Sequence, residues 1–440
     1  MSTPVMKAAL SLRSFFIFNS SFGPKEGEEE KKILFYHPQE TDIDSKVKDV
    51  GLCEAIIKFS STFTTDESVQ ALHTQKTCQL YHQPEPGFWM VMILNVPFER
   101  KSRDSGDYNE YHGDDIHDIV YRAVLKHSYR LFHLFNGTFE SNLAGEDLSA
   151  VANLIGHLEE FYGKYILQLK LKDCDVLDAL GSVQYLPLNQ LLFLRVQNFI
   201  NMIEATFEPI KQCIFLYDEH IIWSGINPTD LYTIYEYLNG SMFSNSPGQE
   251  RSRKIHIKIA GQDKAFNFMV CRKVQHITLC LFLEPVENEQ ALYHELNAVI
   301  NPQLTSISSD ITQHLSQQSC LENGSSKDDC SSTPKFIFFN ELNLHHRGTV
   351  RLGIQKKYQS GGSIPHDVMN LIVDLLNDSR KNNCNIVEET ILKTHEDFWV
   401  VKRSCNSRHV FIVLNKSSTL IDVSEETKRI LDQNMKGVFF

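Results

Sequence analysis

The fold of this chain is decided by residues 14–59, which read SFFIFNSSFGPKEGEEEKKILFYHPQETDIDSKVKDVGLCEAIIKF. Two runs within it, Phe15–Phe18 and Ile33–Tyr36, are aromatic and aliphatic, and such bulky residues favour strands because they pack well on a pleated surface. The segment between the runs contains two glycines and a proline, which predicts a turn. The stretch therefore predicts a strand, a turn and a second strand, followed by a helix over Lys46–Phe59.

The predicted helix has apolar residues on two faces. One face carries Val47, Val50, Cys53 and Ile57, and the other carries Leu52, Ala55, Ile56 and Phe59. A surface helix needs only one apolar stripe, so this helix is either buried on both sides in its own domain or shares one side with another chain. Gly51 would let a neighbouring backbone approach closely, although a glycine in mid-helix costs about 1 kcal/mol relative to alanine.

The same order of elements recurs twice. Further strand, strand and helix patterns end in the helices Leu231–Leu238 and Val368–Leu376, where apolar and polar positions alternate more conventionally. Residues Cys320–Pro334, with four serines, are too polar to bury a core and predict a linker. We therefore expect an α+β chain of three similar domains, at residues 11–172, 183–318 (with a preceding helix) and 335–440, with a linker at 319–334.

Several individual elements follow from local patterns. Phe88–Leu94 is apolar throughout, which is typical of a strand in the middle of a sheet. We expect Thr62–Leu72 to be a polar loop, the charged segment Arg100–Gly113 to be an exposed loop, and Gly348–Ile354 to be a strand. Ser424-Glu425-Glu426 has the pattern of a cap for the last helix.

Composition excludes some classes of function. The formal net charge of -12 argues against a nucleic-acid binder that relies on phosphate neutralisation. The longest apolar run is Phe88–Leu94, far shorter than the roughly 20 residues that a membrane-spanning helix needs. Residues 1–12 lack the apolar core of a signal peptide, and the ten cysteines include no CxxC pair. We expect a cytoplasmic protein with free thiols.

Enzyme chemistry has no signature in the sequence. It contains no GxxxxGK[ST] phosphate loop, no GxSxG nucleophile elbow, no HExxH pair and no glycine-rich dinucleotide fingerprint. None of the 18 histidines stands at ligand spacing from cysteines or carboxylates in the sequence. We therefore expect no catalytic residue, no metal site and no cofactor.

Nine strings along almost the whole chain resemble the Ccz subunits of Mon-Ccz complexes. They are Phe15–Asn19, Phe22–Pro24, Glu26-Gly27, Lys32–Pro38, Val50–Ile56, Leu72–Lys76, Phe88–Met92, Leu134–Phe139 and Ile222–Gly225. Members of this family are built from three longin domains, which agrees with the threefold repeat. One departure is the short connection after Phe243, where vertebrate relatives are expected to carry a long insertion, so a function of that loop is expected to be reduced or absent.

The resemblance implies a subunit of a heterodimeric guanine-nucleotide exchange factor. Its partner would be a Mon subunit, and it would activate the late-endosomal Rab GTPase. The complex would act in endosome maturation, in vesicle trafficking and in fusion with lysosomes, including that of autophagosomes. The first longin domains of the two subunits would pair, and the residues that we expect to contact the Mon subunit are Val50, Gly51, Leu52, Ala55, Ile56 and Phe59. We expect His73 and Lys76 to contact the GTPase.

Exchange would not require covalent catalysis, because such a factor acts by binding the nucleotide-free GTPase best. The alternative is a longin scaffold or tether without exchange activity. A third regulatory subunit and anionic endosomal membrane are further candidate partners, and nucleic acid is not. The short basic clusters Arg251–Lys254, Arg380-Lys381 and Lys402-Arg403 could contact lipid, although a solvated surface is the simpler interpretation. The resemblance implies recruitment from the cytoplasm to late endosomes, lysosomes and autophagosomes.

Overall fold

The computed structural model describes residues 7–63, 69–103, 106–113, 116–143, 148–174, 176–239, 251–258, 265–284, 289–323, 335–349, 364–382, 387–395, 397–414 and 419–434. The chain divides into two compact units, Met1–Ala179 and Leu180–Phe440. Helices alternate with predominantly antiparallel sheets in both units. The α+β class expected from the sequence is therefore confirmed.

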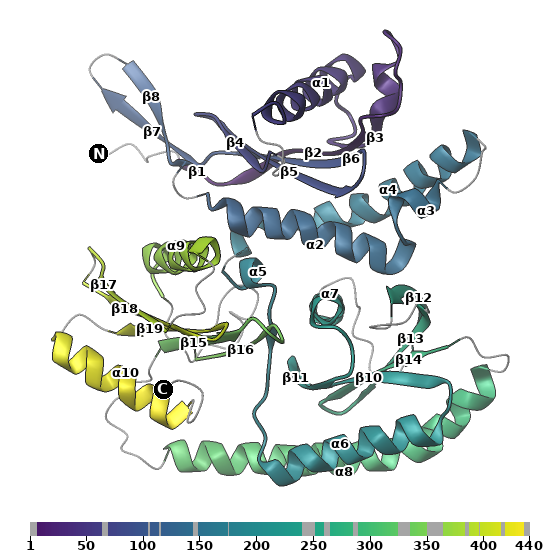
Figure 1. The fold of residues 1–440 in the computed structure, drawn as a ribbon, viewed down its shortest axis with the longest axis vertical. Coiled ribbons are helices and arrows are strands. Elements are labelled where there is room, and N and C mark those ends of the chain that lie inside the picture. Colours follow the sequence, from purple (N-terminus) through teal and green to yellow (C-terminus); the bar gives the residue numbers. More distant parts are fainter. Residues whose placement is uncertain are drawn as a thin grey trace. The chain divides into compact units, whose positions relative to one another are not determined.

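The first unit is a five-stranded antiparallel sheet with helices on both faces (Figure 1). Its strands, in the spatial order β3-β2-β6-β5-β4, are β2 (Ser11–Asn19), β3 (Ile33–His37), β4 (Ala71–His73), β5 (Thr77–Glu85) and β6 (Phe88–Asn95). Helix α1 (Ile43–Ser60) lies on one face, and α2 (Asp118–Asn136), α3 (Phe139–Asn142) and α4 (Leu148–Gln168) lie on the other. Short helices η1 (Glu29–Lys32), η3 (Leu171–Asp173) and α5 (Val176–Leu180) complete this part of the chain. β6 is the central strand, as its apolar sequence predicted.

Strand β2 shows why both faces of the sheet are covered. Its side chains alternate, so Phe16 and Phe18 join the apolar cluster beneath α1, whereas Phe15 packs on the opposite face with its ring 5.2 Å from that of Tyr162 in α4. All three phenylalanines are buried. Consecutive apolar residues in a strand therefore require a layer of helix on each side.

The expected loop at Arg100–Gly113 is instead a charged hairpin, so that prediction was wrong. Strands β7 (Phe98–Arg103) and β8 (Gly106–Tyr111) pair antiparallel, and the short strand β1 (Lys7–Ala8) pairs with β7. Ion pairs bridge the strands, including Lys101 with Glu110 and Arg100 with Asp107. Both ion pairs join diagonal positions of the two strands, and the rings of Phe98 and Tyr111 pack at one end, so the ribbon is held by charge as well as by an aromatic pair.

The second unit holds two more sheets, each with helices on both faces (Figure 1). The first group of elements is α6 (Gln190–Thr206), β10 (Ile210–Tyr217), β11 (His220–Ser224), α7 (Pro228–Asn239), β12 (Arg251–Lys258), β13 (Ala265–Val274), β14 (Ile277–Leu283) and α8 (Glu289–Asn323). The second is β15 (Lys335–Asn340), β16 (His345–Gly348), α9 (His366–Asn382), β17 (Glu388–Lys393), β18 (Trp399–Cys405), β19 (Arg408–Leu414) and α10 (Leu420–Asn434).

The three sheets have the same topology. Their strand orders are β3-β2-β6-β5-β4, β11-β10-β14-β13-β12 and, read from the other edge and leaving aside the added strand β9 (Val183–Gln184), β16-β15-β19-β18-β17. In every case the second strand in the chain is at one edge, the third is at the other, and a helix (α1, α7 or α9) connects these two. The threefold repeat inferred from the sequence is confirmed.

One short segment links the two sheets of the second unit edge to edge. Strand β9 (Val183–Gln184) extends the third sheet by pairing parallel to β16, and Tyr185 forms a parallel bridge with Ile221 of β11. The backbone N–H of Tyr185 donates to the carbonyl of His346, and that of Leu186 donates to the carbonyl of Ile221. Residues 183–186 therefore serve as an edge partner for both sheets.

The predicted start of the last helix also changes. Helix α10 begins at Leu420 rather than at Ser424, because Thr419 and Asp422 cap each other: the Thr419 N–H donates to the Asp422 carboxylate and the Asp422 N–H donates to the Thr419 hydroxyl. The expected strand Gly348–Ile354 lies mostly outside the described residues, and β16 ends at Gly348.

The expected loop Thr62–Leu72, in the first domain, is described only in part. Residues 64–68 lie outside the described ranges, and Ala71 and Leu72 are the first residues of β4.

Candidate partner-binding surface

Helix α1 begins at a well-formed cap and is held to the sheet by polar contacts. The Asp42 carboxylate accepts a hydrogen bond from the Ser45 N–H at 2.9 Å, which satisfies a backbone donor in the first turn. Near the middle of the helix, the Tyr36 hydroxyl of β3 donates to Asp49 at 2.7 Å. Burial and the Asp49 carboxylate both raise the pKa of Tyr36, so this phenol stays protonated and continues to donate.

The inner face of α1 completes the core of its own domain. Val50 and Cys53 are buried in a cluster that includes Phe16, Phe18, Tyr36, Tyr81, Trp89, Val91 and Ile93. Ile56 and Ile57 pack against the same cluster and are partly buried. Val50 is only 2% exposed, so the expectation that it contacts a partner chain was wrong.

Ion pairs of Glu54 also hold α1 in place. Glu54 is buried and accepts ion pairs from Lys32 at 2.8 Å and Lys58 at 2.7 Å. Burial opposes the charge on this carboxyl, but the hydrogen bonds from the two lysines outweigh it, so the pKa of Glu54 lies below its ordinary value. The helix is therefore anchored by charge as well as by apolar packing.

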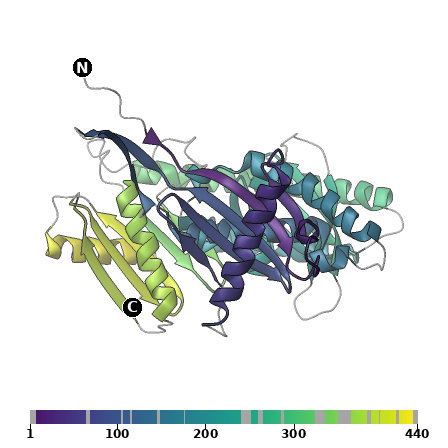
Figure 2. The ribbon, with the colours of Figure 1, turned by 90° about the horizontal axis from the view of Figure 1, so that it is seen from above.

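The outer face of α1 is an apolar stripe that the described chain leaves uncovered. Leu52, Phe59 and Phe63 are 54%, 67% and 73% exposed. Gly51 and Ala55 are exposed beside them, and the space around a side chain at Gly51 is open. Viewed from above, α1 lies over its sheet with its outer side toward the viewer (Figure 2). We call Gly51, Leu52, Ala55, Phe59 and Phe63 the α1 stripe.

Six residues were expected to contact the Mon subunit, and four of them lie on the outer side of α1. The structure adds a further exposed residue, Phe63, to this surface. Gly51, Leu52, Ala55 and Phe59 are exposed, whereas Ile56 is shared between the core and the surface. Phe63 was missed because it was assigned to a polar loop. Its spacing of four residues from Phe59 carried the signal, and the two rings pack edge to face with centroids 4.9 Å apart.

The two residues expected to contact the GTPase lie together on the hairpin of β4 and β5. His73 ends β4, the edge strand, and Lys76 precedes β5, and both side chains are exposed. The His73 ring is 2.8 Å from the carboxylate of Asp118, the first residue of α2. Lys76 is therefore the more accessible of the two for a partner's acidic group.

The search of the sequence found no histidine at ligand spacing from a cysteine or a carboxylate, but the structure brings three such residues together. Nε2 of His73, Sγ of Cys78 and a carboxylate oxygen of Asp118 lie within 4.8 Å of one another. His73 and Cys78 are directly opposed in the β4–β5 pair, and α2 brings Asp118 to them. Burial, together with the Asp118 charge, raises the pKa of the Cys78 thiol to about 12. Sequence spacing could not reveal this group because the third residue comes from a distant helix.

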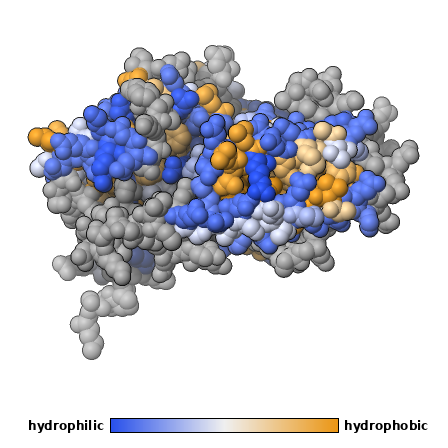
Figure 3. All heavy atoms as spheres, turned by 90° about the horizontal axis from the view of Figure 1, so that it is seen from below, coloured by the Kyte–Doolittle hydropathy of each residue, from blue (hydrophilic) through white to orange (hydrophobic). Residues whose placement is uncertain are grey.

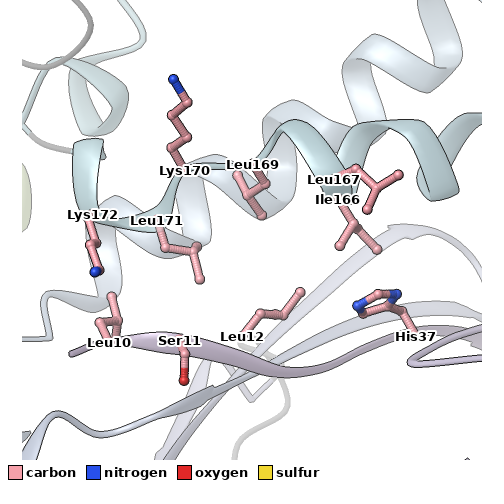
Figure 4. Close-up of a pocket in the computed structure, with 10 residues that line it drawn as sticks. All are labelled: Leu10, Ser11, Leu12, His37, Ile166, Leu167, Leu169, Lys170, Leu171 and Lys172. Carbon is pink, nitrogen blue, oxygen red and sulfur yellow. The ribbon is translucent and has the colours of Figure 1, made fainter. Parts of the chain in front are cut away.

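A cavity of about 550 Å³ lies between the start of β2 and the end of α4. Its lining residues are Leu10, Ser11, Leu12, His37, Ile166, Leu167, Leu169, Lys170, Leu171 and Lys172. Figure 4 shows Leu10 and Leu12 pointing toward Leu171 and Ile166, whereas Lys170 points away. This lining contains no carboxylate or thiol, and its titratable side chains are those of His37, Lys170 and Lys172.

A second apolar surface lies on the second unit. The face that includes α6 and α8 carries apolar patches among hydrophilic residues (Figure 3). On α6, Leu191 is 80% exposed and Phe193 and Leu194 are partly exposed. These residues are at the N-terminal end of the helix, whereas Val196, Phe199 and Ile203 face the core. This patch covers less of its helix than the α1 stripe does.

The basic clusters considered for lipid contact are partly engaged within the protein. Lys402 is buried and pairs with Glu388 at 3.0 Å, and Arg253 donates to the Tyr237 hydroxyl. Lys402 is therefore removed from the candidates for lipid contact. Arg380-Lys381 lie in the last turns of α9. In the described part of the chain, no helix is long and apolar enough to cross a bilayer.

Three family models match the chain, one for each repeat. The model described as the first longin domain of INTU, CCZ1 and HPS4 matches residues 12–137. Those described as Intu longin-like domains 2 and 3 match residues 210–306 and 331–430. The prediction of three longin-like domains is confirmed.

The chain is similar along its whole length to proteins named vacuolar fusion protein CCZ1 homolog. The one from Nematostella vectensis is 35% identical, with 99% of each chain covered. The one from Xenopus laevis is 34% identical, with 98% of each covered. The one from Dictyostelium discoideum is 24% identical, with 100% of each covered.

Proposed function

This chain belongs to the family of vacuolar fusion protein CCZ1 homologues, and from that premise we propose that it is one subunit of a heterodimeric guanine-nucleotide exchange factor. Its obligate partner is a Mon subunit and its target is the late-endosomal Rab GTPase. The name of the relatives supports the broader role in vesicle trafficking and membrane fusion. The finer assignment rests on the family resemblance and on the α1 stripe.

The observation that carries the proposal is the exposure of Leu52 and Phe59 on a helix whose inner face is already buried. Burying each of these side chains against another chain would contribute about 1.5–3 kcal/mol. Two such anchors, flanked by the small residues Gly51 and Ala55, suit the close packing of a second helix. A helix of the first longin domain of the Mon subunit is the proposed occupant.

Nucleotide exchange requires a surface that binds the GTPase in the right orientation and requires no covalent chemistry. A factor that binds the nucleotide-free GTPase more tightly than the loaded form accelerates release by displacing the loops that hold Mg²⁺ and phosphate. The hairpin of β4 and β5 is suited to such contact, because His73 and Lys76 are exposed at the sheet edge. Leu72, beside His73, and Ile56 of α1 pack against the same apolar cluster, so the hairpin and α1 share a core.

Membrane association is proposed to be peripheral. The complex would be recruited from the cytoplasm to late endosomes, lysosomes and autophagosomes, where anionic lipid contributes about 1 kcal/mol per basic residue near the surface. Lys402 is buried and is therefore not proposed to contact lipid. The Arg251–Lys254 and Arg380-Lys381 clusters are, and the Mon subunit or a third regulatory subunit would supply the rest of the contact.

Pairing is tested by co-expressing the full chain with the Mon subunit and measuring the dissociation constant. Leu52→Asp and Phe59→Asp should each weaken the complex at least about a hundredfold, because a carboxylate would be buried without a partner. Leu191→Asp is the matched control, since this leucine is also exposed, at 80%, but lies on α6. Unchanged affinity in both α1 variants would remove the stripe from the interface.

Exchange is tested separately by nucleotide release from the late-endosomal Rab GTPase, with the purified heterodimer. We expect acceleration by the wild-type complex, and a reduced rate with intact pairing in Lys76→Glu. A stable heterodimer that leaves release at its intrinsic rate would favour the alternative, a longin scaffold or tether.

A further inference from the structure

We propose that His73, Cys78 and Asp118 form a site for a single zinc ion. The three residues come from β4, β5 and the first turn of α2. A nitrogen, a thiolate and a carboxylate are the ligand types that zinc uses in proteins, and the inclusion of sulfur disfavours magnesium and calcium. The inference does not require the proposed exchange function, although His73 belongs to the hairpin that is proposed to contact the GTPase.

The distances fit this ion with a small adjustment. Sγ of Cys78 is 3.8 Å from Nε2 of His73 and 3.8 Å from the nearer oxygen of Asp118. Bond lengths of about 2.0–2.3 Å in a tetrahedral site place ligand atoms about 3.3–3.6 Å apart. The His73–Asp118 separation of 2.8 Å would widen by about half an ångström, which an exposed histidine on an edge strand can accommodate.

Charge and burial also suit a zinc ion. One thiolate and one carboxylate would neutralise a divalent cation, which lowers the cost of placing it beside the buried Cys78. His73 and Asp118 are 47% and 38% exposed, so the ion can enter from solvent. Three protein ligands leave a fourth position for water. The bound ion would connect the β4–β5 hairpin to α2.

A simpler arrangement can explain the same contacts. Asp118 is favourable at the first turn of α2 because the helix dipole attracts negative charge, and it pairs with His73 without any metal. Cys78 would then be only a small buried residue in β5. The two interpretations differ in whether the thiol becomes a thiolate bound to a cation.

The test is titration of the metal-free full chain with Co²⁺, a spectroscopic substitute for Zn²⁺. We expect a thiolate-to-cobalt charge-transfer band that saturates at one Co²⁺ per chain and disappears when Zn²⁺ is added. Cys78→Ser should abolish the band. The matched control, Cys174→Ser, alters a half-buried thiol of the same unit and should keep it.

A second variant guards against misfolding of Cys78→Ser. His73→Gln changes an exposed side chain and should weaken Zn²⁺ binding by tenfold or more while leaving the far-ultraviolet circular dichroism unchanged. Zinc should also slow hydrogen exchange in β4 and β5 of the wild-type chain only. Absence of the band in the wild-type chain, or its persistence in Cys78→Ser, would overturn the proposal. Because no GTPase or Mon subunit is present, the outcome is separate from that of the exchange assay.

Discussion

Helices α1 and α7 occupy the same place in their repeats, but their outward faces have different environments. In α7, Tyr232, Tyr235 and Tyr237 are buried, and β9 packs against the helix. On α1, Leu52 and Phe59 are exposed. The same repeat position is thus part of a core in one domain and a free surface in another. The difference lies in whether a segment of the same chain packs against the helix.

The largest effect should come from truncating a buried residue of α7. Ile234 is fully buried, so Ile234→Ala should lower the free energy of local unfolding by about 2–5 kcal/mol through the cavity it leaves. Leu52→Ala on α1 should change it by less than about 0.5 kcal/mol in the isolated chain. Hydrogen exchange of the two helices measures both values. Similar losses in the two variants would mean that α1 is not a free surface.

The next effect concerns Gly181, which lies where β9 approaches α7. Its backbone has φ = +59°, and an added Cβ would lie 3.8 Å from the Tyr232 ring. Space is therefore sufficient, and Gly181→Ala should cost about 1–2 kcal/mol through the left-handed backbone alone. We expect faster hydrogen exchange at residues 183–186 and in α7, with α1 unchanged. Equal exchange in the wild-type chain and the variant would show that β9 is held by other contacts.

A smaller, pH-dependent effect should arise from Glu54, which anchors α1. Its pKa is lowered in the folded state, so its contribution is complete above the ordinary pKa of about 4.5 and is lost as the pH falls through the lower folded value. Glu54→Gln should therefore cost about 1 kcal/mol at neutral pH and less on acidification. Thermal melting of the chain at several pH values measures this. A constant difference between the variant and the wild-type chain across that range would refute the assignment.

The smallest effect should have the opposite sign. Gly51 is a solvent-exposed helical residue with open space around it, so Gly51→Ala should stabilise the isolated chain by about 0.5–1 kcal/mol. In the heterodimer the same methyl should weaken pairing if a partner helix approaches the backbone closely. Hydrogen exchange of α1 and the dissociation constant of the complex give the two values. A gain in both would mean that the partner does not come close at Gly51.

Sequence patterns predicted helices and strands best where the burial period was clear. The apolar run of β6 predicted a central strand, which the structure has. Of the two apolar faces predicted for α1, one is buried in its own domain and the other is exposed, which excludes burial of both faces within the domain. The pattern was less informative for α7, because an alternation of apolar and polar positions was inferred there, whereas Tyr232 and Thr233 are both buried. An aromatic ring with a hydroxyl can lie in a core when the hydroxyl has a partner, and composition alone does not show that partner.

Features formed by distant segments could not be predicted. The ion pairs of the β7–β8 hairpin depend on register, which the charged sequence does not reveal. The group of His73, Cys78 and Asp118 requires a hairpin and a helix about forty residues apart in sequence to meet. Similarly, β9 has only two residues, too few for any periodicity. In each case the information lies in tertiary contact rather than in local pattern.

The short segment that joins β16 and β11 also affects how this protein can be divided. An unpaired edge strand is a template for association with other chains, and residues 183–186 shield two such edges at once. A fragment that starts after Leu186 would expose both and should aggregate, although it would keep every residue matched by the second and third longin models. The boundary for recombinant production of the second unit therefore belongs before Gly181.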